Sequence, residues 1–168
     1  ISKVFKDGRL VARNGIIEPR VISEYEGKAR GTINVRWIEH EDFALKAEGK
    51  YAKVINIIPN QIVTKASVEP VKQDGGYVSS DTEKDILKIA VIERHMASGR
   101  VALGLVKGFG LKKGAISSSV SHDSHNIVVI GTHDGDMYTA AVQVVKMQGG
   151  IVAALNGQVL EALPLPVA

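Results

Sequence analysis

Short runs of alternating apolar and polar residues, separated by glycine-containing turns, recur along most of this chain. The first run extends from Lys3 to Ala12 and is interrupted at Asp7-Gly8. Asp-Gly between two such runs predicts a tight β-hairpin, because a type I′ turn needs positive φ at both central residues. Asn14-Gly15 repeats this turn chemistry a few residues later. Two strands alone are marginally stable in water, so we expect this hairpin to join a larger sheet.

Further strands are predicted through the rest of the chain. The run from Ile86 to Ile92 is almost entirely apolar, as expected of a strand buried on both faces, and Val101 to Val106 is predicted to return beside it. Residues 39–47 are charged enough to form a short exposed turn or helix. The other predicted strands are 32–38, 52–58, 61–71, 115–120, 127–131, 151–155 and 159–163.

One amphipathic helix is predicted after residue 133. Asp134 or Asp136 can cap its start, and Gly149 is expected to supply a left-handed C-cap. The apolar residues at helical spacing are Met137, Ala140, Ala141, Val144 and Met147. Because strands joined by short connections mostly pair antiparallel, the sequence predicts an α+β fold. We expect a largely antiparallel sheet with one or more covering helices, plus the N-terminal hairpin.

Composition excludes several classes of site and partner. The chain has no cysteine, which excludes disulfides, zinc–thiolate sites and a cysteine nucleophile, and fits the reducing cytoplasm. Its net charge of +3 is spread along the sequence, so we expect no nucleic-acid partner. No apolar stretch approaches the ~20 residues of a membrane span. The start at Ile1-Ser2 has no initiator methionine or signal pattern, and we expect the chain to be part of a longer protein.

The segment with the richest chemistry is Ser121-His122-Asp123-Ser124-His125-Asn126, between two apolar strands. Two histidines near an aspartate can bind a metal, transfer a proton or hydrogen-bond a purine edge. The alternative is a polar turn, because Asp, Ser and Asn satisfy their own backbone in such turns. As a metal site the segment is incomplete: Asp123 can add a third ligand, and His133 or Asp134 can approach. A serine nucleophile is disfavoured because the chain has no Gly-x-Ser-x-Gly elbow.

A second polar cluster, Glu93-Arg94-His95, ends the most apolar strand. Three ionisable residues after a buried strand indicate a site or a buried ion pair. The alternative is a solvated strand end that begins the turn 96–100. The glycine-rich stretch from Gly108 to Gly114 lets backbone approach a ligand, but it matches neither the phosphate-loop nor the dinucleotide pattern, and we predict a loop.

Several segments together closely resemble the C-terminal domain of bacterial and archaeal adenine deaminases, which belong to the amidohydrolase superfamily. The resemblance is dense from Ile86 onward and patchy over residues 16–50, and the opening Lys3 to Gly15 looks like the strand pair that follows the catalytic barrel in that family. The other matching segments are Gly114 to Thr132, Glu93-Arg94-His95, Lys107-Gly108-Phe109-Gly110, Asp136-Met137, Gly149-Gly150 and Leu163-Pro164-Leu165-Pro166.

The resemblance implies a hydrolase that converts adenine and water to hypoxanthine and ammonia with a divalent metal (Mn or Fe, or else Zn). In that family a His-x-His pair and further ligands hold the metal in a barrel of about 250 residues. This chain has no His-x-His and is too short for a barrel. We therefore expect a metal-free accessory portion, inactive alone, with adenine, the catalytic barrel and a homo-oligomeric assembly as partners. The alternatives are a non-catalytic assembly module and an autonomous adenine or adenylate binder.

The resemblance also implies a division of the chain and a set of roles. Residues 1–15 would be a hairpin from the barrel-flanking β-sandwich, 16–50 a linker, and 51–168 the C-terminal α+β domain. The segment Ser121 to Asn126 is expected to face the barrel mouth or to clasp domains together. The candidate accessory catalytic residues are His122, Asp123 and His125, and the candidate substrate-binding residues are Ser121, Asn126, Glu93 and His95.

Overall fold

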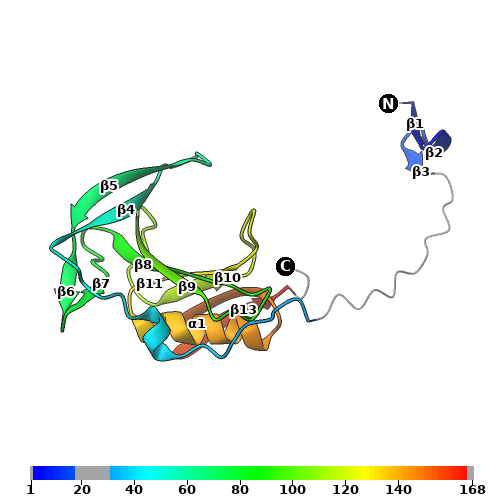
Figure 1. The fold of residues 1–168 in the computed structure, drawn as a ribbon. Coiled ribbons are helices and arrows are strands. Elements are labelled where there is room, and N and C mark those ends of the chain that lie inside the picture. The colour runs from blue at the N-terminus through cyan, green and yellow to red at the C-terminus, as the bar shows by residue number, and fades with distance from the viewer. Residues whose placement is uncertain (1, 18–30, 166–168) are drawn as a thin grey trace.

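The structure of this chain, a computed structural model, describes residues 2–17 and 31–165. The described residues form a three-stranded, an eight-stranded and a two-stranded sheet, with one α-helix against the largest of them (Figure 1). The elements are β1 (Lys3–Lys6), β2 (Arg9–Arg13), β3 (Ile16–Ile17), η1 (His40–Phe43), β4 (Tyr51–Ile57), β5 (Thr64–Pro70), β6 (Lys72–Asp74), β7 (Tyr77–Ser79), β8 (Ile86–Ile92), β9 (Val101–Lys107), β10 (Ala115–Ser118), β11 (Ile127–Gly131), α1 (Asp134–Lys146), β12 (Gly150–Leu155) and β13 (Gln158–Pro164). This arrangement confirms the predicted α+β class.

The N-terminal sheet β1-β2-β3 confirms the hairpin predicted at Asp7-Gly8. These two residues have φ of 51° and 75°, as a type I′ turn requires. Asn14-Gly15 makes a second turn, which leads into β3. The short strand β3 was not predicted, and no strand of this sheet pairs with the eight-stranded sheet. Residues 18–30 of the predicted linker, which spans 16–50, lie outside the described residues.

The eight-stranded sheet has the order β13-β12-β10-β11-β8-β9-β4-β5. Its neighbours pair antiparallel, as the short connections predict, except that β4 and β9 run parallel through Ile55↔Val106 and Asn56↔Lys107. This one pairing was not foreseen, because four strands, β5 to β8, lie between β4 and β9 in the chain. The small sheet β6-β7 was also not predicted.

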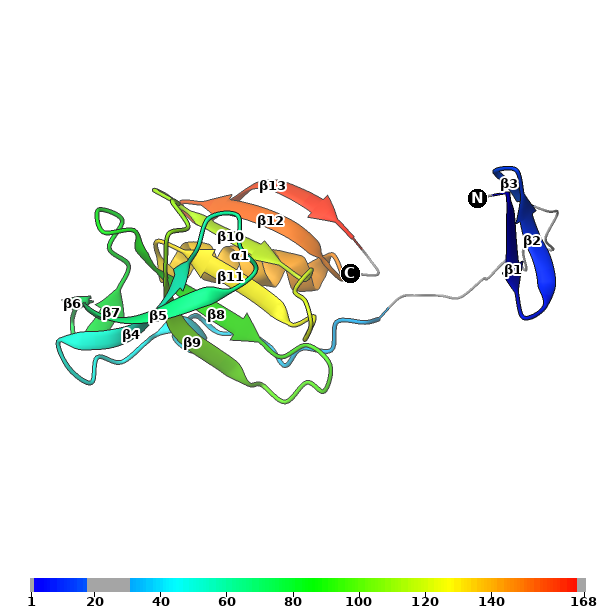
Figure 2. The same ribbon diagram turned by 90° about the horizontal axis from the view of Figure 1, so that it is seen from above.

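Helix α1 covers one face of this sheet (Figures 1 and 2). Four of the five residues of the predicted apolar stripe are buried, and the fifth, Met147, follows the helix and is half-buried. The helix buries Met137, Ala140, Ala141 and Val144 against alternate residues of β8, β10, β11 and β12. Gly131 permits this close packing, because a Cβ added there would lie 2.3 Å from Met137 Cγ. Burial of this apolar face is the main force that holds the helix to the sheet.

The helix ends differently from the prediction. Gln148, and not Gly149, occupies the left-handed position after the last turn, with φ of 61°. The Gly149 N–H donates to the Val144 carbonyl at 3.0 Å and the Gln148 N–H to the Val145 carbonyl at 3.1 Å. These two bonds form a Schellman motif, which moves the left-handed residue one position earlier than the glycine.

The strand predicted at residues 32–38 is wrong. This segment is irregular in the structure, although Ile33 and Ile38 are buried in the same core as α1. Its backbone is joined to the turn after β8 by isolated hydrogen bonds, from the Asn34 N–H to the Arg94 carbonyl at 2.6 Å and from the Ala97 N–H to the Asn34 carbonyl at 2.9 Å. The alternation of apolar residues here reflects packing of an extended segment on the core and not pairing in a ladder.

Lys88, in the middle of β8, joins three elements through one buried ammonium group. Its Nζ donates to the carbonyl of Phe43 in η1 and forms an ion pair with Asp134 Oδ1 at 2.6 Å. The Lys88 side chain is almost fully buried, and Phe43 is completely buried. The predicted turn or helix at 39–47 is therefore present as η1, but it is not wholly exposed. Among the described residues, no helix is long and apolar enough to cross a membrane.

We predict that Lys88→Ala lowers the free energy of unfolding by about 3 kcal/mol, because it leaves the Phe43 carbonyl without its donor and removes the ion pair of the buried ammonium group with the partly exposed Asp134. Urea denaturation measures this difference. Lys84→Ala is the matched control, since Lys84 forms an exposed pair with Asp81 and its loss should cost less than about 0.5 kcal/mol. Equal losses in the two variants would contradict the role given to Lys88.

Candidate functional site at the loop between β10 and β11

The Ser121–Asn126 segment is the connection between two paired strands. Strands β10 and β11 are antiparallel neighbours with Ser118 opposite Val128, so the chain must reverse direction between them. The base of the loop is fixed to β12, because Gly150 donates to Ser119 Oγ at 2.8 Å and Ser119 N–H donates to the Gly150 carbonyl at 3.0 Å. Figure 1 shows this loop rising from the sheet on the side away from α1.

The two histidines of the loop contact each other. The His122 and His125 rings meet edge to face, with centroids 4.9 Å apart and planes at 82°. His122 is exposed and His125 is half-buried. His125 has a left-handed backbone with φ of 51°, a conformation that costs a non-glycine residue about 1 kcal/mol. The fold therefore holds these two imidazoles together at a locally strained turn, a feature that clusters at functional sites.

The other polar residues of the loop differ in exposure. Asp123 and Ser124 are exposed, whereas Ser121 and Asn126 are half-buried. The Ser121 carbonyl accepts a hydrogen bond from His125 N–H, which closes the turn. The Asn126 Oδ1 atom is buried and has no hydrogen-bond partner among the described residues. A buried amide oxygen without a donor is uncommon in folded proteins, and its usual partner is a protein group or an ordered water.

The turn between β8 and β9 brings one more predicted residue to this loop. His95 Nε2 lies 2.9 Å from the carbonyl oxygen of Ser124, a hydrogen bond in which the ring N–H donates. The Ser121–Asn126 loop and the Glu93–His95 cluster, 26 or more residues apart in the sequence, thus lie side by side. The two polar segments that the sequence analysis treated as separate candidate sites are therefore in contact in the structure.

Glu93 holds its own turn together. Its carboxylate accepts hydrogen bonds from the backbone N–H groups of His95, Met96 and Ser98 and from Ser98 Oγ. The bond from the Ser98 hydroxyl, followed by the backbone donors of Met96 and Ser98, lowers the pKa of Glu93 from 4.5 to about 2. Arg94 is buried, and this burial lowers the pKa of its guanidinium. A role of Glu93 in binding substrate stays a prediction.

The remaining candidate metal ligands are engaged elsewhere. His133 Nδ1 lies 3.0 Å from Thr132 Oγ1, and Asp134 pairs with Lys88. Over residues 2–17 and 31–165, no group of three or more His, Asp or Glu side chains is arranged to hold a metal ion. The donor set of the described residues therefore does not fit the divalent metal that the family resemblance implies.

Two features were not predicted from the sequence: the pair of buried Lys88 with partly exposed Asp134, and the Asn126 Oδ1 atom that has no hydrogen-bond partner among the described residues. A signal for the first existed, since Lys88 is the lone charge in an otherwise apolar strand. Such a lysine is buried only when it is paired. The second had no signal, because the burial of one amide oxygen depends on how the loop folds.

Comparison with known proteins gives a consistent result. The family model described as "Adenine deaminase C-terminal domain" matches residues 61–168. The chain is 46% identical over 168 residues to "Adenine deaminase 2" of Carboxydothermus hydrogenoformans, covering 98% of this chain and 29% of that protein. It is 41% identical to an adenine deaminase of Dehalococcoides mccartyi and 46% identical to one of Desulforamulus reducens, again over 29% of each relative. The chain thus spans less than a third of the length of the curated relatives that it matches.

We predict that Glu93→Gln destabilises the protein at pH 7 and that the difference from the unmodified protein shrinks as the pH falls. The folded pKa of about 2 lies below the ordinary 4.5, so the stability from the ionised carboxylate is present above pH 4.5 and is lost as the pH falls towards 2. Urea midpoints measured at pH 7 and at pH 3 test this. A difference independent of pH would show that the carboxylate charge does not stabilise the turn.

Proposed function

The chain belongs to the family of adenine deaminase C-terminal domains, and we propose that it is the accessory part of a hydrolase that converts adenine and water to hypoxanthine and ammonia. The proposal covers the whole enzyme, of which this chain supplies one part. Family membership is supported by the match over residues 61–168 and by identities above 40% along nearly all of the chain.

The metal-dependent step is proposed to belong to the portion of the enzyme outside this chain. The described residues offer no set of three ligands, and the sequence has no His-x-His pair. A divalent ion (Mn, Fe or Zn) in the other portion would activate the attacking water in a hydrolysis of this class. This chain would contribute groups that hold the purine and exclude water from it.

The observation that carries the proposal is the paired imidazoles of His122 and His125, held beside His95 on the side of the sheet away from α1. A neutral imidazole offers one donor and one acceptor, which matches the alternating donors and acceptors of a purine edge. The buried Asn126 Oδ1 adds an acceptor that a ring N–H or an amino group can satisfy. Asp123 and Ser121 complete the polar lining of the loop.

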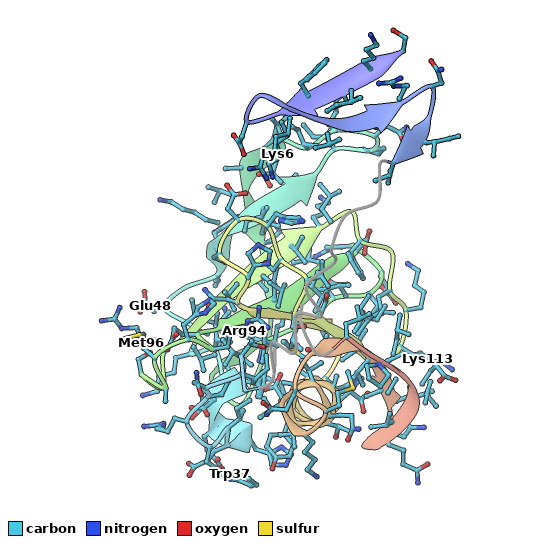
Figure 3. All side chains as sticks on the ribbon, turned by 90° about the vertical axis from the view of Figure 1, so that its right-hand side faces the viewer. Lys6, Trp37, Glu48, Arg94, Met96 and Lys113 are labelled. Atoms are coloured by element: carbon cyan, nitrogen blue, oxygen red, sulfur yellow. The ribbon has the colours of Figure 1, made fainter. Side chains whose placement is uncertain are left out.

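The same proposal includes a cytoplasmic location and a homo-oligomeric enzyme. The absence of cysteine favours a reducing compartment. Trp37 favours assembly: it is exposed and points outward on the side of the molecule where α1 lies (Figure 3), and large exposed aromatic side chains are enriched at interfaces.

We predict that His125→Ala in the full-length enzyme lowers kcat/KM for adenine by about 100-fold, the usual contribution of a group that positions or exchanges a proton. The deamination is followed by absorbance. The matched control is His40→Ala, because His40 stacks on Tyr138 at 3.7 Å between ring centroids, away from the loop and beside α1. Unchanged kinetics together with a lowered unfolding midpoint in His125→Ala would show that the loop is only a structural clasp.

We further predict that this 168-residue chain alone, supplied with Mn²⁺ or Fe²⁺, does not deaminate adenine. The physical reason is that water activation needs a metal held by several ligands, and none of the described clusters provides them. The full-length enzyme in the same buffer is the positive control. Turnover by the chain alone would mean that the Ser121–Asn126 loop forms a complete catalytic site and that the accessory role is wrong.

A further inference from the structure

The face of the large sheet away from α1 is apolar across most of its width. Residues opposite each other in antiparallel strands share a face, so the register defines rows of neighbours. One row consists of Leu163, Ile151, Ser118, Val128, Val91 and Ala102. The next row consists of Glu161, Ala153, Ile116, Ile130, Ile89 and Gly104. We name the surface formed by these two rows the open sheet face.

The opposite face of the same strands is buried, whereas the described residues leave the two rows of the open sheet face partly exposed. The residues that alternate with these rows, such as Ile127, Val129 and Val152, are completely buried under α1. On the open sheet face, Ile151 is 38% exposed and Leu163 is 56% exposed. Four further residues of these rows are only half-buried: Val91, Val128, Ile116 and Ile130. The sheet therefore has one buried face and one apolar face that is partly exposed to water in these two rows, whereas Leu87 and Val106, further along the same side, are buried.

The same face continues onto the β4–β5 hairpin. The parallel pairing of Ile55 with Val106 and the antiparallel pairing of Lys53 with Val68 place Ile55 and Val68 on this side. Both are exposed, at 45% and 66%. At the tip of the hairpin, Ile62 and Val63 are exposed as well.

The open sheet face is flanked by raised elements on the same side. Figure 1 shows the β4–β5 hairpin and the Ser121–Asn126 loop both rising from the sheet away from α1, and Figure 2 looks down on them. Charged residues of this surface, Lys53 and Glu161, lie towards its two ends, and the strands between them present uncharged side chains in both rows. An apolar centre with a polar rim is the usual composition of an interface between proteins or domains.

We propose that the open sheet face docks against the portion of the same full-length polypeptide that lies outside this chain. This chain covers only 29% of each adenine deaminase relative, so in a full-length enzyme of their size a body more than twice as large as this chain would be covalently attached to it. A tethered body has a high effective concentration, and it occupies an apolar face ahead of free partners. This inference rests on the proposed place of the chain in a longer enzyme, and it does not require a catalytic role for any loop residue.

The experiment uses thiol labelling of the full-length protein, because this chain has no cysteine of its own. Ile151→Cys lies on the open sheet face. Val159→Cys is the matched control: it faces the α1 side, opposite Ala154, and the two residues have nearly equal exposure in this chain, 38% and 39%. Maleimide labelling rates are read from the peptides that contain these two positions, so thiols elsewhere in the protein do not interfere.

If the proposal is right, Ile151→Cys reacts at least about tenfold more slowly than Val159→Cys in the folded full-length protein, and the rates become equal in urea. Equal rates in the folded protein would overturn the proposal. The labelling rates do not depend on enzyme activity. Slow labelling of Ile151→Cys together with unchanged kinetics of His125→Ala would therefore support the docking surface and contradict the catalytic role of the loop.

A second copy of the chain is the other possible occupant, and cross-linking separates the two. A benzophenone-bearing amino acid at position 163 is activated by light, and the product is run on a denaturing gel. A cross-linked product of single-polypeptide mass, with its second peptide outside this chain, supports docking within one polypeptide. A product of doubled mass shows that another subunit covers the face and contradicts the proposal.

Discussion

The buried ammonium group of Lys88 is the contact on which the arrangement of this domain depends. It lies in the central strand β8 and binds a carbonyl of η1 and the first residue of α1 at once. A charge in this position is tolerated only with its partners in place, since an unpaired buried charge costs several kcal/mol. The position of α1 over one face of the sheet is thus specified by an electrostatic contact as well as by apolar packing. The N-terminal end of the helix also favours the carboxylate of Asp134 next to it.

With α1 fixed on one side, the sheet is asymmetric. Strands β8, β10, β11 and β12 present apolar residues on both faces of the sheet. Only one of these faces is covered by the described part of the chain. The loops that leave the strand ends therefore differ in surroundings. The turn at Asn156-Gly157 lies near α1, where Gly157 N–H donates to Asp136. The Ser121–Asn126 loop rises on the open side, where its imidazoles are accessible to a ligand or to another domain.

The sequence predicted the elements that depend on local rules. Asp7-Gly8 and Asn14-Gly15 have positive φ at both positions, so these two turns follow from residue type alone. The apolar stripe of α1 likewise follows from the helical spacing of its apolar residues.

The strand predicted at 32–38 was wrong, because packing of an extended segment on a core produces the same alternation of apolar residues as pairing in a sheet. The parallel contact of β4 with β9 and the approach of His95 to Ser124 join distant segments, and a single sequence carries no signal for such tertiary contacts. The polar composition of the Ser121–Asn126 loop was visible, whereas its hydrogen bonds depend on the fold.

The loop and the open sheet face share one physical condition. The buried Asn126 Oδ1 has no hydrogen-bond donor among the described residues, and the neighbouring sheet face has apolar side chains in contact with water. Each is unfavourable alone, the first because a buried acceptor has lost its water and the second because apolar surface remains hydrated. The loop that contains Asn126 rises on the same side as the open sheet face, so a single body docked there would contact both. Such a body would also exclude water from the imidazoles of His122 and His125 and so strengthen their hydrogen bonds to a bound purine. The docking proposed for the sheet face and the binding proposed for the loop are therefore linked: the first creates the low-dielectric surroundings in which the second becomes strong.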